Sequence, residues 1–148
     1  MLSTLARLAL AGVFVVAGAI KAADPQQAVQ AVRAYQLLPA RLEPLVGWGL
    51  PFLEIALGLL LLLGLSTRMA AAACAVLLVG FLAGVASAAA RGLSIDCGCF
   101  GGGGTVAPGE TKYLSEILRD SALLACAGWL LWHPSSLFSL DRATLEDR

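Results

Sequence analysis

Four long apolar stretches, separated by shorter polar segments, dominate the pattern of this chain. They run from about Leu5 to Ala23, Leu45 to Leu65, Met69 to Ala90 and Tyr113 to Trp132. An α-helix needs about 20 predominantly apolar residues to cross a bilayer. The third stretch contains no charged residue, and the charges of the fourth lie in its first two turns. The pattern therefore predicts four transmembrane helices.

A shorter amphipathic segment follows the first stretch. Asp24 and Pro25 are typical of a helix start, with Asp as the N-cap and Pro at the first helical position. The helix should end before Pro39 and carry Tyr35 on its apolar face. Because it is too short and polar to span, we expect it to lie at the membrane interface, folded over the bundle, with Tyr35 as an amphipathic anchor.

The remaining connections predict the topology. Residues 65–68 form a tight hairpin, whereas residues 91–112 form the longest loop. Residues 134–148 are a short tail, expected to be mobile. Four spans place both termini on one side. We expect the first stretch to be retained rather than cleaved as a signal peptide, because Gly18 and Lys21 continue a helical stripe.

Composition supports a membrane protein. Hydrophobic residues make up 59% of the 148 residues and charged residues 14%, against about 45–50% and about 25% in soluble domains. So small a soluble core could not hide this much apolar surface. Ten basic residues balance ten acidic ones, so no cationic field attracts nucleic acid. The expected fold is an all-α, polytopic four-helix bundle.

Three of the apolar stretches carry a stripe of small or polar residues at helical spacing. Such stripes let helices approach closely within the bilayer, while Leu and Val face lipid. The three predicted stripes are Arg7, Ala11, Phe14, Gly18 and Lys21; Gly47, Pro51, Glu54 and Gly58; and Ala73, Gly80, Gly84 and Ser87.

Cys97 and Cys99 in the long loop are the sharpest chemical signal. Residues two apart can bring their Cα atoms to about 5–7 Å, within disulfide range, and the strained ring would be readily reduced. Gly98 supplies backbone freedom, and the run from Gly101 would let the loop approach a partner. A metal site is the alternative, but Cu(I) would need further soft ligands. Asp96 would raise the thiol pKa, and Arg91 or Lys112 could lower it; the sequence leaves the balance open.

The other polar and thiol residues have simpler interpretations. Glu54 lies in mid-helix and needs a partner or a polar cavity, and we expect Arg119 to pair with it. Arg7 and Lys21 should reach opposite interfaces as helix-end anchors. Cys74 and Cys126, in the membrane half away from the loop, should behave as small hydrophobic residues.

Four motifs in order carry a family resemblance. They are Gly18-x-x-Lys21, Tyr35-x-Leu37-Leu38-Pro39, Leu50-Pro51-x-x-Glu54-x-x-x-Gly58 and Cys97-Gly98-Cys99-Phe100-Gly101. With them, the chain resembles the MauE branch of the DoxX-like redox-associated membrane proteins, over about residues 4 to 132. The Cys-Gly-Cys-Phe-Gly loop is the most specific part of the match.

The resemblance implies a membrane bundle that takes part in thiol–disulfide chemistry outside the cytoplasm. It implies thioredoxin-like partners and a role in maturing disulfide-rich or cofactor-bearing enzymes such as methylamine dehydrogenase. Related branches are linked to quinones, which makes a quinone a candidate cofactor. By position, Cys97 and Cys99 would be the redox pair. The loop motif adds Gly98, Phe100 and Gly101, and the polar set beneath it would be Lys21, Tyr35, Glu54 and Arg119.

Three functions therefore stay open. The first is a thiol–disulfide oxidoreductase that exchanges electrons with an extracytoplasmic thioredoxin-like protein. The second is a copper- or metal-handling protein using the same thiols, and the third is a non-catalytic maturation factor. We expect a multi-pass protein of the cytoplasmic (inner) membrane without a resident metal. Redox chemistry places the loop outside, although the count of Lys and Arg mildly favours the inverse orientation.

Overall fold

The computed structural model describes residues 1–133, so the predicted mobile tail lies outside the described residues. The helices are α1 (Leu2–Ala23), α2 (Pro25–Ala34), α3 (Glu43–Leu63), α4 (Thr67–Ala90) and α5 (Tyr113–Trp132). Two short strands, β1 (Ile95–Asp96) and β2 (Gly104–Thr105), lie between α4 and α5. The four long helices agree with the predicted apolar stretches to within a few residues.

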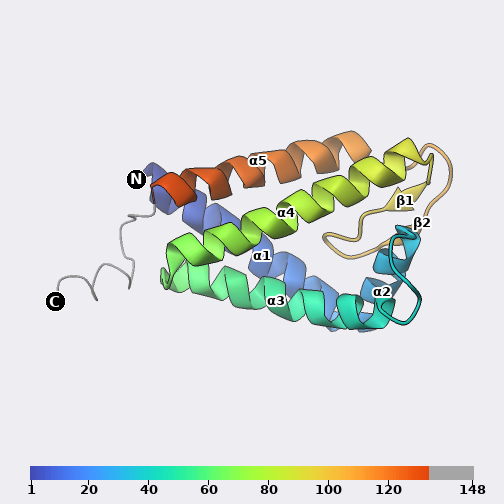
Figure 1. Cartoon of the computed structure of the whole chain (residues 1–148), viewed down its shortest axis with the longest axis horizontal. Coiled ribbons are helices and arrows are strands. Elements are labelled where there is room, and N and C mark those ends of the chain that lie inside the picture. The colour runs from blue at the N-terminus through green and yellow to red at the C-terminus, as the bar shows by residue number, and fades with distance from the viewer. Residues whose placement is uncertain (134–148) are drawn as a thin grey trace.

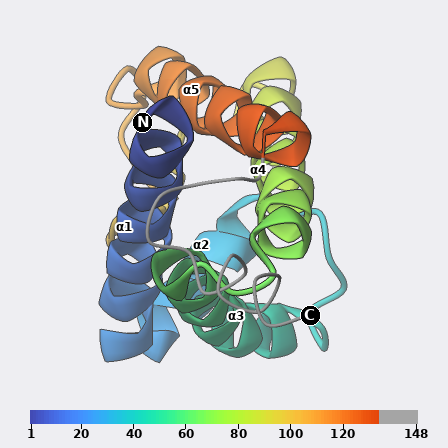
Figure 2. The same cartoon turned by 90° about the vertical axis from the view of Figure 1, so that its left-hand side faces the viewer.

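The four long helices run side by side along the length of the molecule (Figure 1). Seen end-on, their order around the bundle is α1, α5, α4 and α3, so that α3 and α5 lie diagonally opposite (Figure 2). The start of α1 and the end of α5 share one end of the bundle, where the Trp129 indole donates a hydrogen bond to Ser3 Oγ at 3.2 Å. Helix α2 and the cysteine loop occupy the other end.

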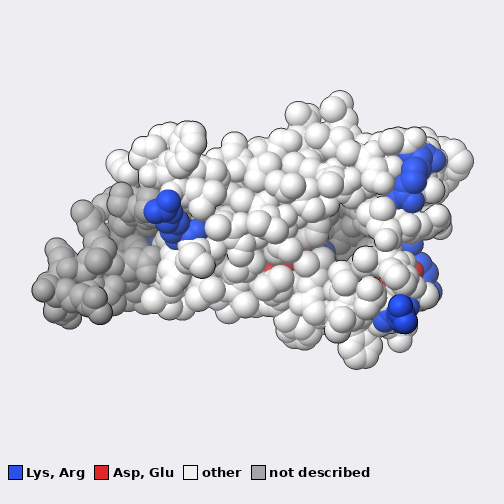
Figure 3. Space-filling view, in the orientation of Figure 1, with Lys and Arg blue, Asp and Glu red and all other residues white. Residues whose placement is uncertain are grey.

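Helices α1, α3 and α4 are long and apolar enough to cross a membrane. In the space-filling view, charged side chains gather towards the two ends of the molecule, and the band between them is almost free of charge (Figure 3). The all-α membrane fold is thus confirmed. Helix α5 has 20 residues but carries Glu116, Arg119 and Asp120, and its crossing stays a prediction.

The stripes predicted for α1 and α3 form the tightest contact in the bundle. A Cβ placed on Gly18 would lie 2.7 Å from the Pro51 carbonyl oxygen, and one on Gly58 would lie 2.6 Å from Val15 Cγ2. Side chains larger than hydrogen would therefore force the helices apart. Glycine at these positions lets α1 and α3 pack backbone against backbone.

The stripe predicted for α4 is only partly correct, since Gly84 is buried but Gly80 is not. The buried face of α4 also includes Ala71, Cys74, Leu78, Val85 and Ala88, which pack into the core as ordinary apolar residues. The prediction relied on the helical spacing of small residues, yet Gly80 is exposed. Together with Gly84 it lines a cavity between α4 and α3 rather than a helix contact.

The prediction that Arg7 and Lys21 extend to the membrane interfaces is also wrong. Arg7 is 2% exposed, because it shares the inward face of α1 with Leu10 and Phe14. The Lys21 side chain is 9% exposed and pairs with Glu54. Both cations lie on the packed face of α1, which prevents their side chains from reaching the headgroups.

Helix α2 crosses the loop end of the bundle (Figure 1). Its predicted start is confirmed, since Asp24 Oδ1 accepts a hydrogen bond from the Gln27 amide at 3.0 Å and Pro25 is the first helical residue. The other end is held to α3 by an ion pair of 2.7 Å between Arg33 and Glu43. These contacts position α2 as a cover over the cysteine loop.

Candidate functional site: a dithiol beneath helix α2

The cysteine loop folds back against α2. The antiparallel pairing of β1 with β2, in the register Ile95 with Thr105, closes the loop at its base. A Cβ on Gly103 would lie 2.5 Å from Ala31 Cβ, and one on Gly98 would lie 2.6 Å from it. The expectation that the glycine run leaves the loop free to reach outward is therefore corrected, because the glycines instead allow close packing on α2.

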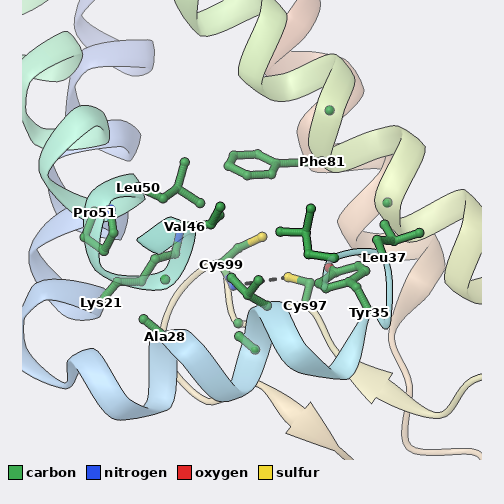
Figure 4. Close-up of a pocket in the computed structure, with 17 residues that line it drawn as sticks. Lys21, Ala28, Tyr35, Leu37, Val46, Leu50, Pro51, Phe81, Cys97 and Cys99 are labelled. Atoms are coloured by element: carbon green, nitrogen blue, oxygen red, sulfur yellow. Dashed lines mark hydrogen bonds between the residues drawn. The ribbon is translucent and has the colours of Figure 1, made fainter. Parts of the chain in front are cut away.

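Cys97 and Cys99 are half-buried free thiols, and their side chains hydrogen-bond to each other. The Cys99 amide donates to Cys97 Sγ at 3.3 Å (Figure 4). Arg119 Nη2 approaches the same sulfur at 3.9 Å. The two sulfurs thus lie in one cluster. Hydrogen-bond donors and cations around it stabilise a negative charge on the pair of sulfurs.

The two thiols differ in their readiness to ionise. The pKa of Cys99 is lowered, chiefly by the hydrogen bond from the Cys97 thiol and then by the positive charges of Lys21 and Arg119, which together outweigh burial. The pKa of Cys97 is raised, first because its proton is held in that hydrogen bond and second by burial. Cys99 therefore ionises first, and Cys97 keeps its proton.

The predicted partnership of Glu54 with Arg119 is wrong. Glu54 accepts two hydrogen bonds from Lys21 Nζ, at 2.7 and 2.9 Å, whereas Arg119 pairs with Asp120 at 2.9 Å. The reason is the order of the helices. Lys21 lies one turn beyond the close contact of α1 with α3, while Arg119 is on the diagonally opposite α5.

These two ion pairs nevertheless share a space. Glu54, Lys21, Arg119 and Asp120 line a small cavity at the centre of the bundle, together with Cys99. The Lys21 ammonium lies 5.5 Å from the centre of the Phe81 ring, and the Arg119 guanidinium lies 5.0 Å from that of Phe100. Both distances are within cation–π range. Two paired cations thus lie directly beneath the thiol that ionises first.

A larger cavity of about 260 Å³ lies on the other side of the thiols. Both cysteines line it, with apolar residues from α2, α3 and α4 such as Val32, Leu50 and Phe81. The labelled side chains surround this space in Figure 4. Figure 3 shows the corresponding hollow on the lateral face of the molecule, between α3 and α4 near the loop end. The dithiol therefore faces a space that opens to the side of the bundle.

Tyr35 belongs to this cavity and does not act as an interfacial anchor. Its ring lies 3.4 Å from where a Cβ on Gly84 would be, so it packs against α4. Burial raises its pKa, with a further contribution from the nearby Cys97. The phenol therefore keeps its proton. The cations that lower the pKa of Cys99 are Lys21 and Arg119, whereas Arg91, one of the two expected from the sequence, donates a hydrogen bond to the Tyr35 carbonyl.

Among the described residues, one group could hold a metal ion. Oxygens of Asp96 and Glu116 and the sulfur of Cys97 lie within 4.8 Å of one another. This set combines one soft ligand with two hard ones, and Cys99 is not part of it. Cu(I) prefers sulfur ligands, so the arrangement does not favour the copper alternative.

Several residues of the site were missed by sequence reasoning. Asp120 follows Arg119 directly, and adjacent helix positions do not usually face each other. Glu116 looked like an ordinary first-turn acid near the membrane surface. Phe81 sits within an uninterrupted apolar run and has no polar signal at all. Of the three, Glu116 and Asp120 could have been suspected, because buried acids within an apolar helix are rare.

These features describe a helical membrane protein with a half-buried dithiol between an apolar cavity and two ion pairs. The family model of methylamine utilisation protein MauE matches residues 1–133. The chain belongs to this family. No curated protein and no solved structure matches the chain.

Proposed function

We propose that this protein is a membrane thiol–disulfide oxidoreductase whose redox centre is Cys97 and Cys99. The observation that carries the proposal is the pair of hydrogen-bonded thiols placed over two cations. A thiolate is the nucleophile of disulfide exchange, and the site lowers the pKa of Cys99. Cys99 attacks a partner's disulfide, or is released from one, and Cys97 resolves the mixed disulfide.

The partner exchanging electrons with this pair is proposed to be an extracytoplasmic thioredoxin-like protein. The family's name refers to methylamine utilisation, and maturation of methylamine dehydrogenase, or of another disulfide-rich enzyme, is the process in which we place the exchange. The packing of the loop against α2 means that a protein partner gains access to the sulfurs when the loop or α2 shifts. The wider DoxX-like grouping stays a prediction.

The second electron carrier is proposed to be a quinone from the bilayer. The cavity of about 260 Å³ is apolar, opens laterally and exposes both sulfurs. Cavities lined mainly by apolar groups with a few polar ones are typical small-molecule sites. A ring-sized headgroup could enter between α3 and α4 while its apolar tail stays in the lipid. The small central cavity beneath Cys99 is lined by both ion pairs and is a less suitable site for an apolar carrier.

The dithiol function is tested by alkylation and mass spectrometry in native membranes. After oxidation, Cys97 and Cys99 should be protected from alkylation, and dithiothreitol should remove that protection. Cys74, which is 0% exposed in the core, and Cys126 should show no redox-dependent change. If both loop thiols remain alkylatable after oxidation, the proposal fails.

The non-catalytic alternative is separated by a trapping variant. In Cys97→Ser, the remaining Cys99 should capture a thioredoxin-like partner in a mixed disulfide that dithiothreitol releases, because the resolving thiol is missing. Cys99→Ser is the matched control and should capture much less, since the thiol with the lowered pKa is lost. A holding role would be favoured if both variants bound the partner equally, and if washing and reductant released the partner equally from both.

A further inference from the structure

Cys97 lies between two different environments. Its sulfur lines the apolar cavity, and on its other side it lies within 4.8 Å of carboxylate oxygens of Asp96 and Glu116. Those two acids also line a separate cavity of about 520 Å³ at the loop end, with Glu110, Thr111 and Lys112. Asp96 and Glu116 therefore connect the thiol that keeps its proton with a polar space.

Glu116 is the carboxylate that contacts Cys97 and still has one oxygen without a donor among the described residues; it accepts a hydrogen bond from the Cys97 backbone. It is 8% exposed, and within residues 1–133 its Oε2 is buried with no hydrogen-bond partner. Asp96 Oδ1 instead accepts the Gly98 amide at 3.2 Å and so holds the loop, and Asp120 is paired with Arg119. A buried carboxylate oxygen without a donor costs free energy, which is recovered when that oxygen takes up a proton.

We propose that Glu116 accepts the proton of Cys97 when the disulfide forms and returns it when the disulfide is reduced, exchanging it with the polar cavity at the loop end. This role rests on the proposed dithiol function. The apolar cavity then serves the electron carrier, while protons leave on the opposite side of the same sulfur.

The proton balance of the exchange requires a proton acceptor next to Cys97, and Glu116 is placed to be that acceptor. The Cys99 thiolate attacks a partner's disulfide, forming a mixed disulfide and releasing one partner thiolate. Cys97 then attacks Cys99 Sγ, the mixed disulfide breaks, and the second partner thiolate leaves with the electron pair. The Cys97 proton must depart as the new sulfur–sulfur bond forms, and it passes to Glu116. Reduction reverses each step, and Glu116 then protonates the leaving Cys97 sulfur.

Stopped-flow oxidation of the reduced protein in lipid nanodiscs tests this role. The probe is dithiodipyridine, a small uncharged disulfide that releases one thiopyridone when Cys99 attacks and a second when Cys97 closes the ring. Cys74 and Cys126 are replaced by Ala in the background. Glu116→Gln should slow the second release roughly 100-fold near neutral pH, the low end of general-base contributions, and leave the first release unchanged.

Two further variants make the result specific. Glu116→Asp keeps a carboxylate and should recover part of the rate of the second release. When that rate is plotted against pH, Glu116→Asp should still reach a plateau. In Glu116→Gln the rate should instead rise steadily with the hydroxide concentration. Asp24→Asn, at the exposed N-cap of α2 where Asn caps equally well, should leave both releases unchanged. A second release that is unchanged in Glu116→Gln, or slowed equally with the first, overturns the role of Glu116 alone. A starting protein that releases a single thiopyridone overturns the dithiol function as well.

Discussion

At the scale of single residues, the ion pair of Lys21 with Glu54 is the most deeply buried of the three ion pairs among the described residues. Their side chains are 9% and 2% exposed. Removing one partner of a buried pair leaves an uncompensated charge and costs about 3–5 kcal/mol. We expect Lys21→Met to lower the free energy of unfolding by this amount in detergent, and Glu54→Gln by less, because the amide still accepts a hydrogen bond.

The pairing itself is tested by combination. Lys21→Met with Glu54→Leu should be more stable than the sum of the single losses predicts, because no buried charge remains. Arg33→Met is the matched control, since the Arg33 side chain is 63% exposed in its pair with Glu43. Its loss should stay within about 1 kcal/mol, as for surface pairs. Strictly additive losses for Lys21 and Glu54 would contradict the contact.

A second residue-scale prediction concerns the pH dependence of thiol reactivity. The pKa of Cys99 is lowered, so its thiolate should persist, and react with iodoacetamide, at pH values where an ordinary thiol is protonated. Reactivity should fall only as the pH drops below this lowered pKa. Arg119→Gln removes one stabilising cation and should move the midpoint upward. Arg91→Gln, whose cation binds the Tyr35 carbonyl, should leave it in place; equal midpoints in both variants would contradict the assignment.

The residues of the site could be recognised from the sequence, but not their partners. Two cavities are lined by the residues named from the sequence, and their roles stay predictions: Cys97, Cys99, Lys21, Tyr35, Glu54 and Arg119. That Glu54 pairs with Lys21 depends on which helices are neighbours, and helix order is a property of the folded bundle. Each helix alone is compatible with either partner. Asp120 and Glu116 were missed for the same reason, since their burial follows from the packing of α5.

At the scale of elements, the contact between the cysteine loop and α2 decides access to the thiols. Gly103 has a φ of +99° and would place a Cβ 2.5 Å from Ala31 Cβ, whereas Gly109 has a φ of +91° and open space around it. Ala at either site carries the positive-φ cost of about 1–2 kcal/mol. Gly103→Ala should add a packing cost of about 1–3 kcal/mol, so it should destabilise more than Gly109→Ala.

The same substitution should also expose the redox pair. Loop displacement in Gly103→Ala should speed the reaction of the loop thiols with a bulky maleimide, and Gly109→Ala should not. Adding Ala31→Gly removes the colliding Cβ and should slow the reaction again. Unchanged maleimide rates in Gly103→Ala would show that the loop contact does not limit access.

Element-scale patterns were reliable where small residues meet and misleading where they face space. The glycine stripes of α1 and α3 identify a true contact, because Gly18 and Gly58 each leave no room for a Cβ. The glycines of α4 have the same spacing, but Gly80 and Gly84 line the apolar cavity. Spacing alone cannot distinguish a helix contact from a cavity wall, since both need small side chains. The packing of the cysteine loop against α2 could not be predicted from the sequence, because a glycine run is equally typical of a loop that makes no such contact.

At the scale of the whole molecule, the charges of α5 matter for both the proposed function and the topology. Hydropathy and charge identify three spans, and α5 differs because Glu116 and Asp120 are buried towards the site. The helix runs beside α4 along the bundle (Figure 1). We therefore propose that α5 is a fourth span whose charges are shielded from lipid by its neighbours. Four spans place both ends of the described chain on one side.

Orientation is the remaining whole-molecule question, and the structure weakens the argument from charge. The positive-inside rule counts Lys and Arg in the short loops that flank the spans. On the loop side, Lys21 and Arg119 belong to the site, Arg33 pairs with Glu43, and Arg91 binds a carbonyl. The loop-side excess of cations therefore shrinks. A redox pair that cycles through a disulfide belongs in an oxidising compartment, so we expect the loop outside and the α3–α4 hairpin inside.

Labelling with a membrane-impermeant maleimide in intact cells decides the orientation. In a variant without native cysteines, Glu110→Cys adds an exposed thiol at the loop end, and Arg68→Cys adds one at the hairpin. Because both positions are exposed, labelling reports the side of the membrane rather than local burial. Glu110→Cys should label before lysis and Arg68→Cys only after it. The reverse pattern would place the dithiol in the cytoplasm, where reductants keep thiols reduced, and would remove the compartmental basis for exchange with an extracytoplasmic partner.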